Sequence, residues 1–404
     1  MVEWKEYRIK DLGEVVTGNT PPTSNREYYG TEYKFIKPTD MVEGQRFVST
    51  TEEYYSELAY QKYKKCLLPP KTPCVVTIGS LGKKMCLTDT ECFTNQAVNA
   101  VIPNKENDGE FLYYAFKASV LAYVKQLDSG TTSGRENVSK SSFSKIKVRV
   151  PPLPTQQKIA SILSAYDNLI QNYKKQIEAL QTAASELYKE WFVRFRFPGY
   201  KNSRFENGIP EGWKVYLIKD LCYINKKTVS SKDAKKEILY LDTGSITENV
   251  IDSFESYILE EAPSRARRIV KKNSIIFSTV RPNQNHYGIL KTVPENLIVS
   301  TGFAVFDPKF DIANILYFFL SSKDFVDYCQ MIAEGAVATY PSIKPEEIGK
   351  VKILLPTMDL AIKLNHSFES LFLRIENLKQ QITNLTQQRD LLLPRLMSGK
   401  LEVE

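Results

Sequence analysis

The chain has 404 residues, of which 42% are hydrophobic and 25% charged, with a formal net charge of +7. This length predicts two or three domains whose cores need no metal or disulfide, and the composition is that of an ordinary globular protein. No run of about 18 apolar residues exists, which excludes a membrane-spanning helix. The charged segment 1–10 lacks the apolar stretch of a signal peptide, so the expected location is the cytoplasm. The small positive charge is compatible with nucleic acid but does not require it.

The cysteines and histidines give no sign of a metal site. The six cysteines form no Cys-x-x-Cys pair, and only two histidines occur, His286 and His366. Zinc sites need ligands at short, defined spacings, and histidine-based catalytic sites are hard to assemble from two histidines. We therefore expect no metal site, and we expect reduced cysteines that pack as small apolar side chains.

The chain repeats itself. The segment 4–12 recurs at 213–221 with seven of nine positions identical. Looser matches follow in the same order and pair 68–78 with 270–280, 111–114 with 315–318, and 143–148 with 348–353. A period of about 200 residues is much longer than that of a solenoid repeat, which is about 20 to 50 residues. The sequence therefore predicts a duplicated domain, with one copy in roughly 1–200 and the other in 210–404.

Each copy begins with a mixed part of about 150 residues, which predicts an α+β fold. The short, β-branched runs 74–78 and 274–278 are typical of strands. The segments 109–127 and 311–332 have helical spacing and are expected to pack on the sheets. The two predicted globular domains are residues 1–152 and 211–356.

A long helix is predicted after each globular part. Thr155 can serve as the N-cap of the first, and apolar residues then alternate every four and three positions, the period of a coiled coil. The predicted helices span 153–197 and 357–398, with a linker at 198–210 and a tail at 399–404. Helix–helix packing is assigned to Ile159, Leu163, Ile170, Ile177, Leu180, Leu187, Leu364, Leu371, Ile375, Leu378, Ile382 and Leu385. A helix of about 36 residues is about 54 Å long. We therefore expect an antiparallel pair that separates the two domains, with a pseudo-two-fold relation between the copies.

Sequence signatures of common enzymes are absent. The nearest approach to a phosphate-binding P-loop, at 79–84, has the wrong spacing and lacks the hydroxyl, so it is interpreted as a loop that flanks a strand. No Gly-x-Gly-x-x-Gly turn, Gly-x-Ser-x-Gly elbow or Asn/Asp-Pro-Pro-aromatic tetrapeptide occurs. The chain is expected not to be an enzyme and to hold no cofactor of its own.

Polar loops and basic clusters are the candidates for a binding function. Residues 129–140 are rich in small hydroxyl side chains, and their counterpart is 334–344. Hydroxyl and backbone N–H groups can hold phosphates, whereas arginine, lysine and asparagine can read base edges. A basic cluster at 265–272, with Arg281 nearby and a counterpart at 62–65, is a second candidate. Each of these segments could instead be an ordinary solvated surface.

Several short motifs carry a family resemblance. They are Pro-Leu-Pro-x-Gln-Gln-x-Ile at 152–159, Trp-Phe-Val-Arg-Phe at 191–195, the ending at 393–401 and the turn at 18–22. Their order and duplication resemble the specificity subunit of type I restriction-modification systems. The second copy departs from the pattern, because 356–359 lack the glutamines and 225–228 lack the Gly-Thr-Pro-like turn.

This resemblance implies a role in DNA recognition. Each globular part would be a target recognition domain that reads one half of a bipartite, asymmetric sequence in double-stranded DNA. The helices would set the spacing and dock two methyltransferase subunits, which use S-adenosylmethionine, and motor-nuclease subunits would join for cleavage with ATP and Mg²⁺. The residues expected to contact DNA are Thr20, Thr131, Thr132, Arg135, Asn137, Lys140, Arg265, Arg267, Arg268, Arg281, Tyr340 and Lys344.

Two other classes of function stay open from the residues alone. One is a coiled-coil adaptor that binds proteins without DNA specificity, and the other is a stand-alone DNA enzyme. DNA affinity that weakens steeply with salt would favour the specificity subunit over the adaptor. Methylation by the purified chain alone would favour the enzyme.

Overall fold

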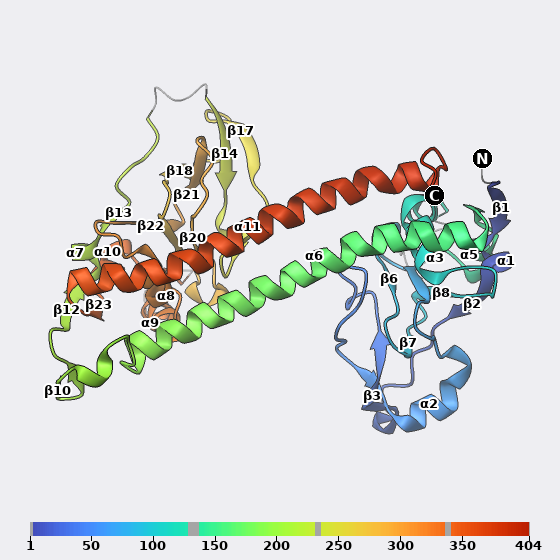
Figure 1. The fold of residues 1–404 in the computed structure, drawn as a ribbon, viewed down its shortest axis with the longest axis horizontal. Helices are drawn as coiled ribbons and strands as arrows, with labels where there is room; N and C mark the ends of the chain where they lie inside the picture. The colour runs from blue at the N-terminus through green and yellow to red at the C-terminus, as the bar shows by residue number, and fades with distance from the viewer. Residues whose placement is uncertain (1–2, 128–136, 231–235, 336–340, 404) are drawn as a thin grey trace. The chain divides into compact units, whose positions relative to one another are not determined.

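The computed structural model describes residues 3–127, 137–230, 236–335 and 341–403. The chain divides into two compact units (Figure 1), and each contains one globular part and a portion of each long helix. Unit one is Met1–Tyr173 with Gln381–Glu404, and unit two is Lys174–Gln380. Within the described ranges, no helix is both long and apolar enough to cross a membrane, and no group of three or more His, Cys, Asp or Glu side chains could hold a metal ion.

Unit one is built on three small sheets. The orders are β1-β9, β2-β8-β5-β6 and β4-β3-β7. The strands are β1 Lys5–Arg8, β2 Gly13–Thr17, β3 Tyr29–Ile36, β4 Tyr54–Tyr55, β5 Pro73–Val76, β6 Met85–Leu87, β7 Cys92–Thr94, β8 Val98–Pro103 and β9 Lys147–Val150. The helices are α1 Ile9–Leu12, α2 Glu57–Tyr63, α3 Gly109–Ala115, α4 Leu121–Gln126 and α5 Lys140–Lys145, with a π-helical turn between α3 and α4.

Unit two repeats this topology. The sheet β13-β22-β19-β20 has the same antiparallel pairings as β2-β8-β5-β6, and β17-β14-β21-β18 resembles β4-β3-β7 with one added strand. Its strands are β10 Phe205–Glu206, β11 Ile209–Pro210, β12 Lys214–Leu217, β13 Cys222–Ile224, β14 Glu237–Leu241, β15 Ile246–Thr247, β16 Val250–Ile251, β17 Glu255–Ile258, β18 Ala266–Ile269, β19 Ile275–Ser278, β20 Tyr287–Ile289, β21 Leu297–Ser300, β22 Phe303–Pro308 and β23 Lys352–Leu355. Its short helices are α7 Ile218–Leu221, α8 Ala313–Leu320, α9 Lys323–Glu334 and α10 Pro345–Gly349. The predicted α+β class and the duplication are confirmed.

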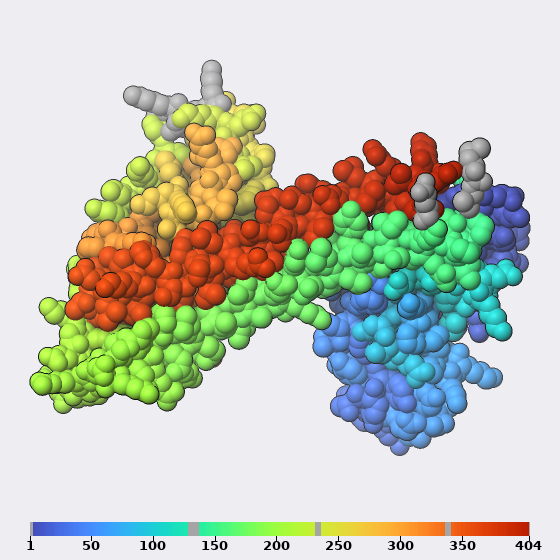
Figure 2. Space-filling model, in the orientation of Figure 1, coloured from blue at the N-terminus to red at the C-terminus, as the bar shows by residue number. Residues whose placement is uncertain are grey.

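The two long helices run antiparallel within each unit. They are α6, Leu153–Tyr188, and α11, Met358–Met397. In unit one, Leu163 near the start of α6 shares a core with Leu396 near the end of α11. In unit two, Tyr188 at the end of α6 shares a core with Phe368 near the start of α11. In the space-filling view α6 is green and α11 is red (Figure 2). Every residue assigned to helix–helix packing is buried or half-buried, and some, such as Leu163, also pack on the globular core.

The N-cap assigned to α6 differs from the prediction. The helix begins at Leu153, so Thr155 lies inside its first turn, where its N–H donates to the carbonyl of Pro152 at 2.9 Å, and is not the N-cap. The neighbouring Gln156 is 1% exposed and ties the helix to the globular part, because its Oε1 accepts from the backbone N–H of Asp108 at 2.9 Å. Proline is favourable in the first turn of a helix, so Pro154 is compatible with a helix that begins before Thr155.

Candidate nucleic-acid interface

Loops from separate parts of unit one meet at one edge of the sheet β2-β8-β5-β6. The backbone N–H of Thr77, just after β5, donates to the carbonyl of Ala97 at 2.8 Å. The carbonyl of Thr77 in turn accepts from the backbone N–H of Val138 at 2.8 Å, and Val138 belongs to the candidate loop 129–140. Asn137 forms an isolated antiparallel bridge with Ile78. The segment 137–140 is therefore held against the loop that leaves β5.

The turn at 18–22 lies at the same edge. The backbone N–H of Asn19 donates to the carbonyl of Thr94 at 2.9 Å, and a Cβ at Gly18 would stand only 2.0 Å from that carbonyl oxygen, so only glycine fits. The hydroxyl of Thr20 donates to Oε1 of Gln96. From the neighbouring sheet, Tyr55 donates its hydroxyl to the carbonyl of Asn19 at 2.5 Å. Thr20 and Asn137 are thus both fixed to this edge.

Unit two builds the same frame. Thr279, just after β19, donates its N–H to the carbonyl of Gly302 at 2.8 Å, and its own carbonyl accepts from Ile343 at 2.9 Å. The backbone N–H of Arg281 donates to the carbonyl of Pro341 at 3.0 Å. Lys344 follows directly and is the exposed N-cap residue of α10. Arg281 and Lys344 therefore lie near the same edge of their sheet, as Asn137 and Thr20 do in unit one.

Arg265, directly before β18, and Arg267 and Arg268, within it, differ in environment. Arg265 is exposed, and its carbonyl accepts from Thr301 at 2.8 Å, which places it at the edge that also carries Arg281. Arg267 is half-buried at a β-bulge, where two residues oppose one on β21. Burial lowers the pKa of the Arg268 guanidinium, and Glu346 partly offsets this effect. Arg265 is the one of the three whose side chain is best exposed to a ligand.

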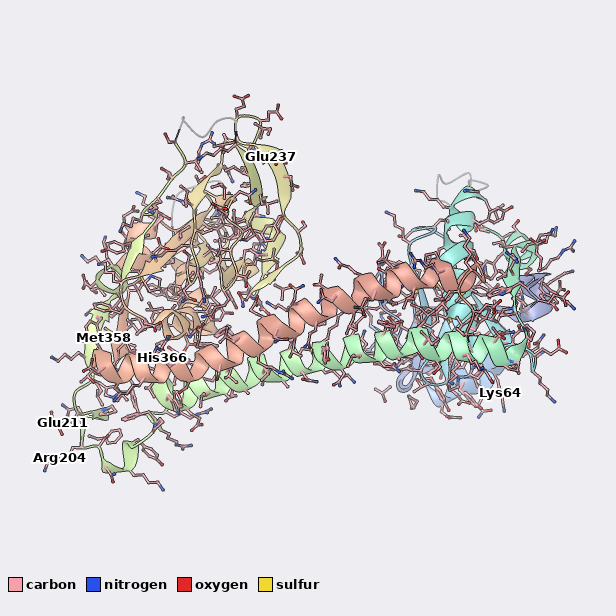
Figure 3. All side chains as sticks on the ribbon, turned by 45° about the horizontal axis from the view of Figure 1, so that its top comes forward. Lys64, Arg204, Glu211, Glu237, Met358 and His366 are labelled. Atoms are coloured by element: carbon pink, nitrogen blue, oxygen red, sulfur yellow. The ribbon has the colours of Figure 1, made fainter. Side chains whose placement is uncertain are left out.

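The basic residues predicted as one cluster at 265–272 extend from one end of β18 to the other. Lys271 and Lys272 lie after β18, at the end opposite Arg265, and Lys272 acts electrostatically on Lys291 and Glu369 beside α11. The counterpart at 62–65 in unit one lies on α2 and the turn after it, where Lys62 donates to the Tyr28 hydroxyl at 2.8 Å. Figure 3 labels Lys64 in this segment.

Four of the residues expected to contact DNA lie outside the described residues, namely Thr131, Thr132, Arg135 and Tyr340. Lys140 is the exposed first residue of α5, whose N-cap is Ser139. Residues 79–84, interpreted from the sequence only as a strand-flanking loop, and their counterparts 281–286 belong to the same edges. Both loops follow equivalent strands at the same distance in the repeat, and this signal in the sequence could have identified them as candidate binding loops.

Comparison with known proteins identifies the family. The sequence pattern described as "Type I restriction modification DNA specificity domain" matches residues 1–182 and 210–388. The chain belongs to this family. It is a specificity subunit of a type I restriction-modification system, and DNA target recognition follows from that membership. The resemblance inferred from the short motifs is confirmed.

Relatives of this specificity subunit match it over all or part of its length. It is 28% identical to the type I restriction enzyme MjaIX specificity subunit of Methanocaldococcus jannaschii, over 100% of this chain and 94% of that protein. It is 35% identical over 175 residues to the HindI specificity subunit of Haemophilus influenzae, covering 42% and 38% of the two chains. Its fold is similar to that of an S subunit from M. genitalium, with a TM-score of 0.62 and 16% identity over 98% and 96% of the chains.

Proposed function

We propose that this specificity subunit reads a bipartite, asymmetric sequence in double-stranded DNA, with each unit reading one half. The observation that carries the proposal is the repeated frame with unlike side chains. The loops after β5 and β19 are anchored by equivalent backbone hydrogen bonds at Thr77 and Thr279. The residues that these loops present differ, with Gly79 in unit one and Arg281 in unit two. Two equivalent frames with different exposed groups suit two different half-sites.

The long helices are proposed to set the distance between the half-sites. Each is continuous, with 36 residues in α6 and 40 in α11. At about 1.5 Å per residue these correspond to about 54 and 60 Å. Their packed apolar faces favour a stiff element over a flexible linker.

The same helices are proposed to dock two methyltransferase subunits. In unit one, a groove of about 710 Å³ lies between the start of α6 and the end of α11 and is lined mostly by apolar groups, including Ile162 and Leu401. Ile162 is 37% exposed and Leu401 43% exposed, and exposed apolar surface of this kind favours a protein partner. Motor-nuclease subunits would join for cleavage. We assign the chemistry, with S-adenosylmethionine, ATP and Mg²⁺, to these partners and not to this chain.

The experiment that tests the proposal is sequencing of methylated bases in DNA from cells that express this chain with its methyltransferase. A two-part motif with a constant gap is expected, and its two halves should differ. Exchange of residues 1–152 for the same domain of a relative should change one half only. A continuous motif would contradict the two-reader proposal. Unaltered DNA, together with DNA affinity that does not fall with salt, would favour the adaptor.

A further inference from the structure

The backbone of unit one fixes Asn19 at the sheet edge that carries the candidate interface. The N–H of Asn19 donates to the carbonyl of Thr94 at 2.9 Å, and its carbonyl accepts from the Tyr55 hydroxyl at 2.5 Å. Gly18 and Pro21, on either side of Asn19, are buried. Both polar groups of the Asn19 backbone are therefore occupied, by contacts that any residue other than proline could make at this position.

The side chain of Asn19, unlike its backbone, has no contact that explains why asparagine occupies the position. Asn19 is exposed, and among the described residues its amide has no hydrogen-bond partner. Asparagine is common in turns because it tolerates the left-handed conformation and because its side chain can bond a nearby backbone group. Asn19 does not have a positive φ. The neighbouring Asn95 shows the usual role, since its Oδ1 accepts from the N–H of Ala97 at 3.1 Å. Neither reason applies to Asn19, so folding of the turn does not require asparagine there.

The amide of Asn19 is suited to reading a base. It combines an acceptor with donor hydrogens on one planar group, which matches N6 and N7 of adenine in the major groove. The side chain is short and its backbone is already held, so little freedom is lost when it binds. The next residue, Thr20, is fixed at the same edge by its bond to Gln96. A short polar side chain on a rigid support is the arrangement that precise recognition needs.

The segment 225–229 of unit two replaces this turn with another structure. The N–H of Val229 donates to the carbonyl of Arg267 at 2.9 Å, and the carbonyl of Lys227 accepts from the N–H of Ile269 at 3.1 Å. This segment therefore pairs with β18. An effect of Asn19 on recognition is accordingly expected only in the half-site read by unit one.

We propose that Asn19 is a specificity-determining residue that makes paired hydrogen bonds with an adenine in the half-site read by unit one. This inference rests on the proposed function. It requires that the unmodified chain, assembled with its methyltransferase, gives a two-part motif, in which exchange of residues 1–152 identifies the half read by unit one. If no two-part motif appears, the proposed function fails and this inference falls with it. A two-part motif that the Asn19 variants leave unchanged refutes this inference alone.

The test compares Asn19→Ala and Asn19→Asp with the control Asn104→Ala, each in the full chain with its methyltransferase. Asn104 is an exposed asparagine of unit one whose side chain does have structural partners, because it donates to the carbonyl of Asp11 and accepts from the N–H of Glu106, both at 3.1 Å. Asn19→Ala should relax the motif at one adenine of one half. On duplexes carrying the motif, preference for that adenine should fall by about 5- to 150-fold. Asn19→Asp should lose the preference too, because a carboxylate keeps the shape but cannot donate to N7.

Stability separates recognition from folding. Asn19→Ala removes no structural hydrogen bond, so its Tm should equal that of the unmodified chain. Asn104→Ala should do the reverse, with a lower Tm and an unchanged motif. A marked fall in Tm for Asn19→Ala would overturn the proposal, since it would show a structural role. So would an altered preference at a base pair other than A·T, or a uniform loss of affinity over all sequences, which would indicate a contact with the DNA backbone.

Discussion

A buried ion pair in unit one provides the sharpest test of how the long helices are held. Nη1 of Arg389 donates to Oδ1 of Asp167 at 2.6 Å, and the Tyr114 hydroxyl donates to Oδ2 of the same carboxylate at 2.6 Å. Asp167 is 7% exposed and Arg389 8% exposed. Burial raises the pKa of Tyr114 well above its ordinary range, and Asp167 raises it further, so the hydroxyl stays protonated and donates. We predict that Arg389→Ala is strongly destabilising, because it leaves a buried carboxylate without its cation.

The magnitude follows from this burial. Removal of one partner of a buried ion pair costs about 3 to 5 kcal/mol. For a unit of this size, 1 kcal/mol corresponds to about 2 to 4 °C in Tm, so unit one should melt about 6 to 20 °C lower. Lys323→Ala, in the exposed pair with Asp327, is the matched control and should leave the Tm almost unchanged, because solvent screens exposed ion pairs.

Unit two indicates how the loss can be reversed. By the repeat, Tyr114, Asp167 and Arg389 correspond to Phe318, Phe372 and Ala184, and the rings of Phe318 and Phe372 are 5.8 Å apart. The triple variant Tyr114→Phe, Asp167→Phe, Arg389→Ala should therefore regain most of the stability lost by Arg389→Ala, since buried pairs can be replaced by packed apolar groups.

Urea unfolding measures the stability of Arg389→Ala and of the triple variant. Hydrogen exchange in peptides from 381–397 and 358–380 shows which unit has lost stability. Faster exchange is expected in 381–397 of unit one, with 358–380 of unit two little changed. A cost below about 1 kcal/mol for Arg389→Ala would refute the reasoning, as would a triple variant no more stable than the single one.

Two further predictions concern the termini and pH. A circular permutant that joins the ends and opens at Asn207–Gly208, the turn of an exposed hairpin, should fold and recruit the methyltransferase, because Gly399 lies against Trp4; failure to recruit it in a pull-down would count against this. Burial raises the pKa of Glu369. The hydrogen bonds that it accepts, the strongest from Lys291 at 2.6 Å, outweigh burial and hold the pKa below its ordinary value of 4.5. The stabilisation is therefore present above pH 4.5 and lost as pH falls below it. Urea midpoints of the unmodified chain and Glu369→Gln should converge in acid, and a constant difference would contradict the assignment.

The fold was predictable because duplication preserves the apolar pattern. The identities between 4–12 and 213–221 fall on β1-α1 and β12-α7, whose buried residues include Ile9 and Ile218. The strand pairings were not predictable, since β2 pairs with β8 across a long separation that depends on the whole unit. In the same way, Arg389 interrupts the apolar stripe of α11 in the sequence. Its partner is Asp167, on another helix, and the spacing of apolar residues along one helix cannot indicate this buried ion pair.

The candidate site was harder to predict than the fold, because loop side chains are exposed and packing does not constrain them. Thr20 and Asn137 could be selected as polar residues in turns, but nothing in their spacing showed that they lie at one sheet edge. Arg281 differs from them, because its backbone is in the left-handed conformation, which glycine adopts more readily than arginine. This difference is recognised only when Arg281 is compared with Gly79, which is left-handed at the equivalent position of unit one. A duplicated fold thus supplies its own reference, because the residue at a position in one unit can be compared with the residue at the equivalent position of the other.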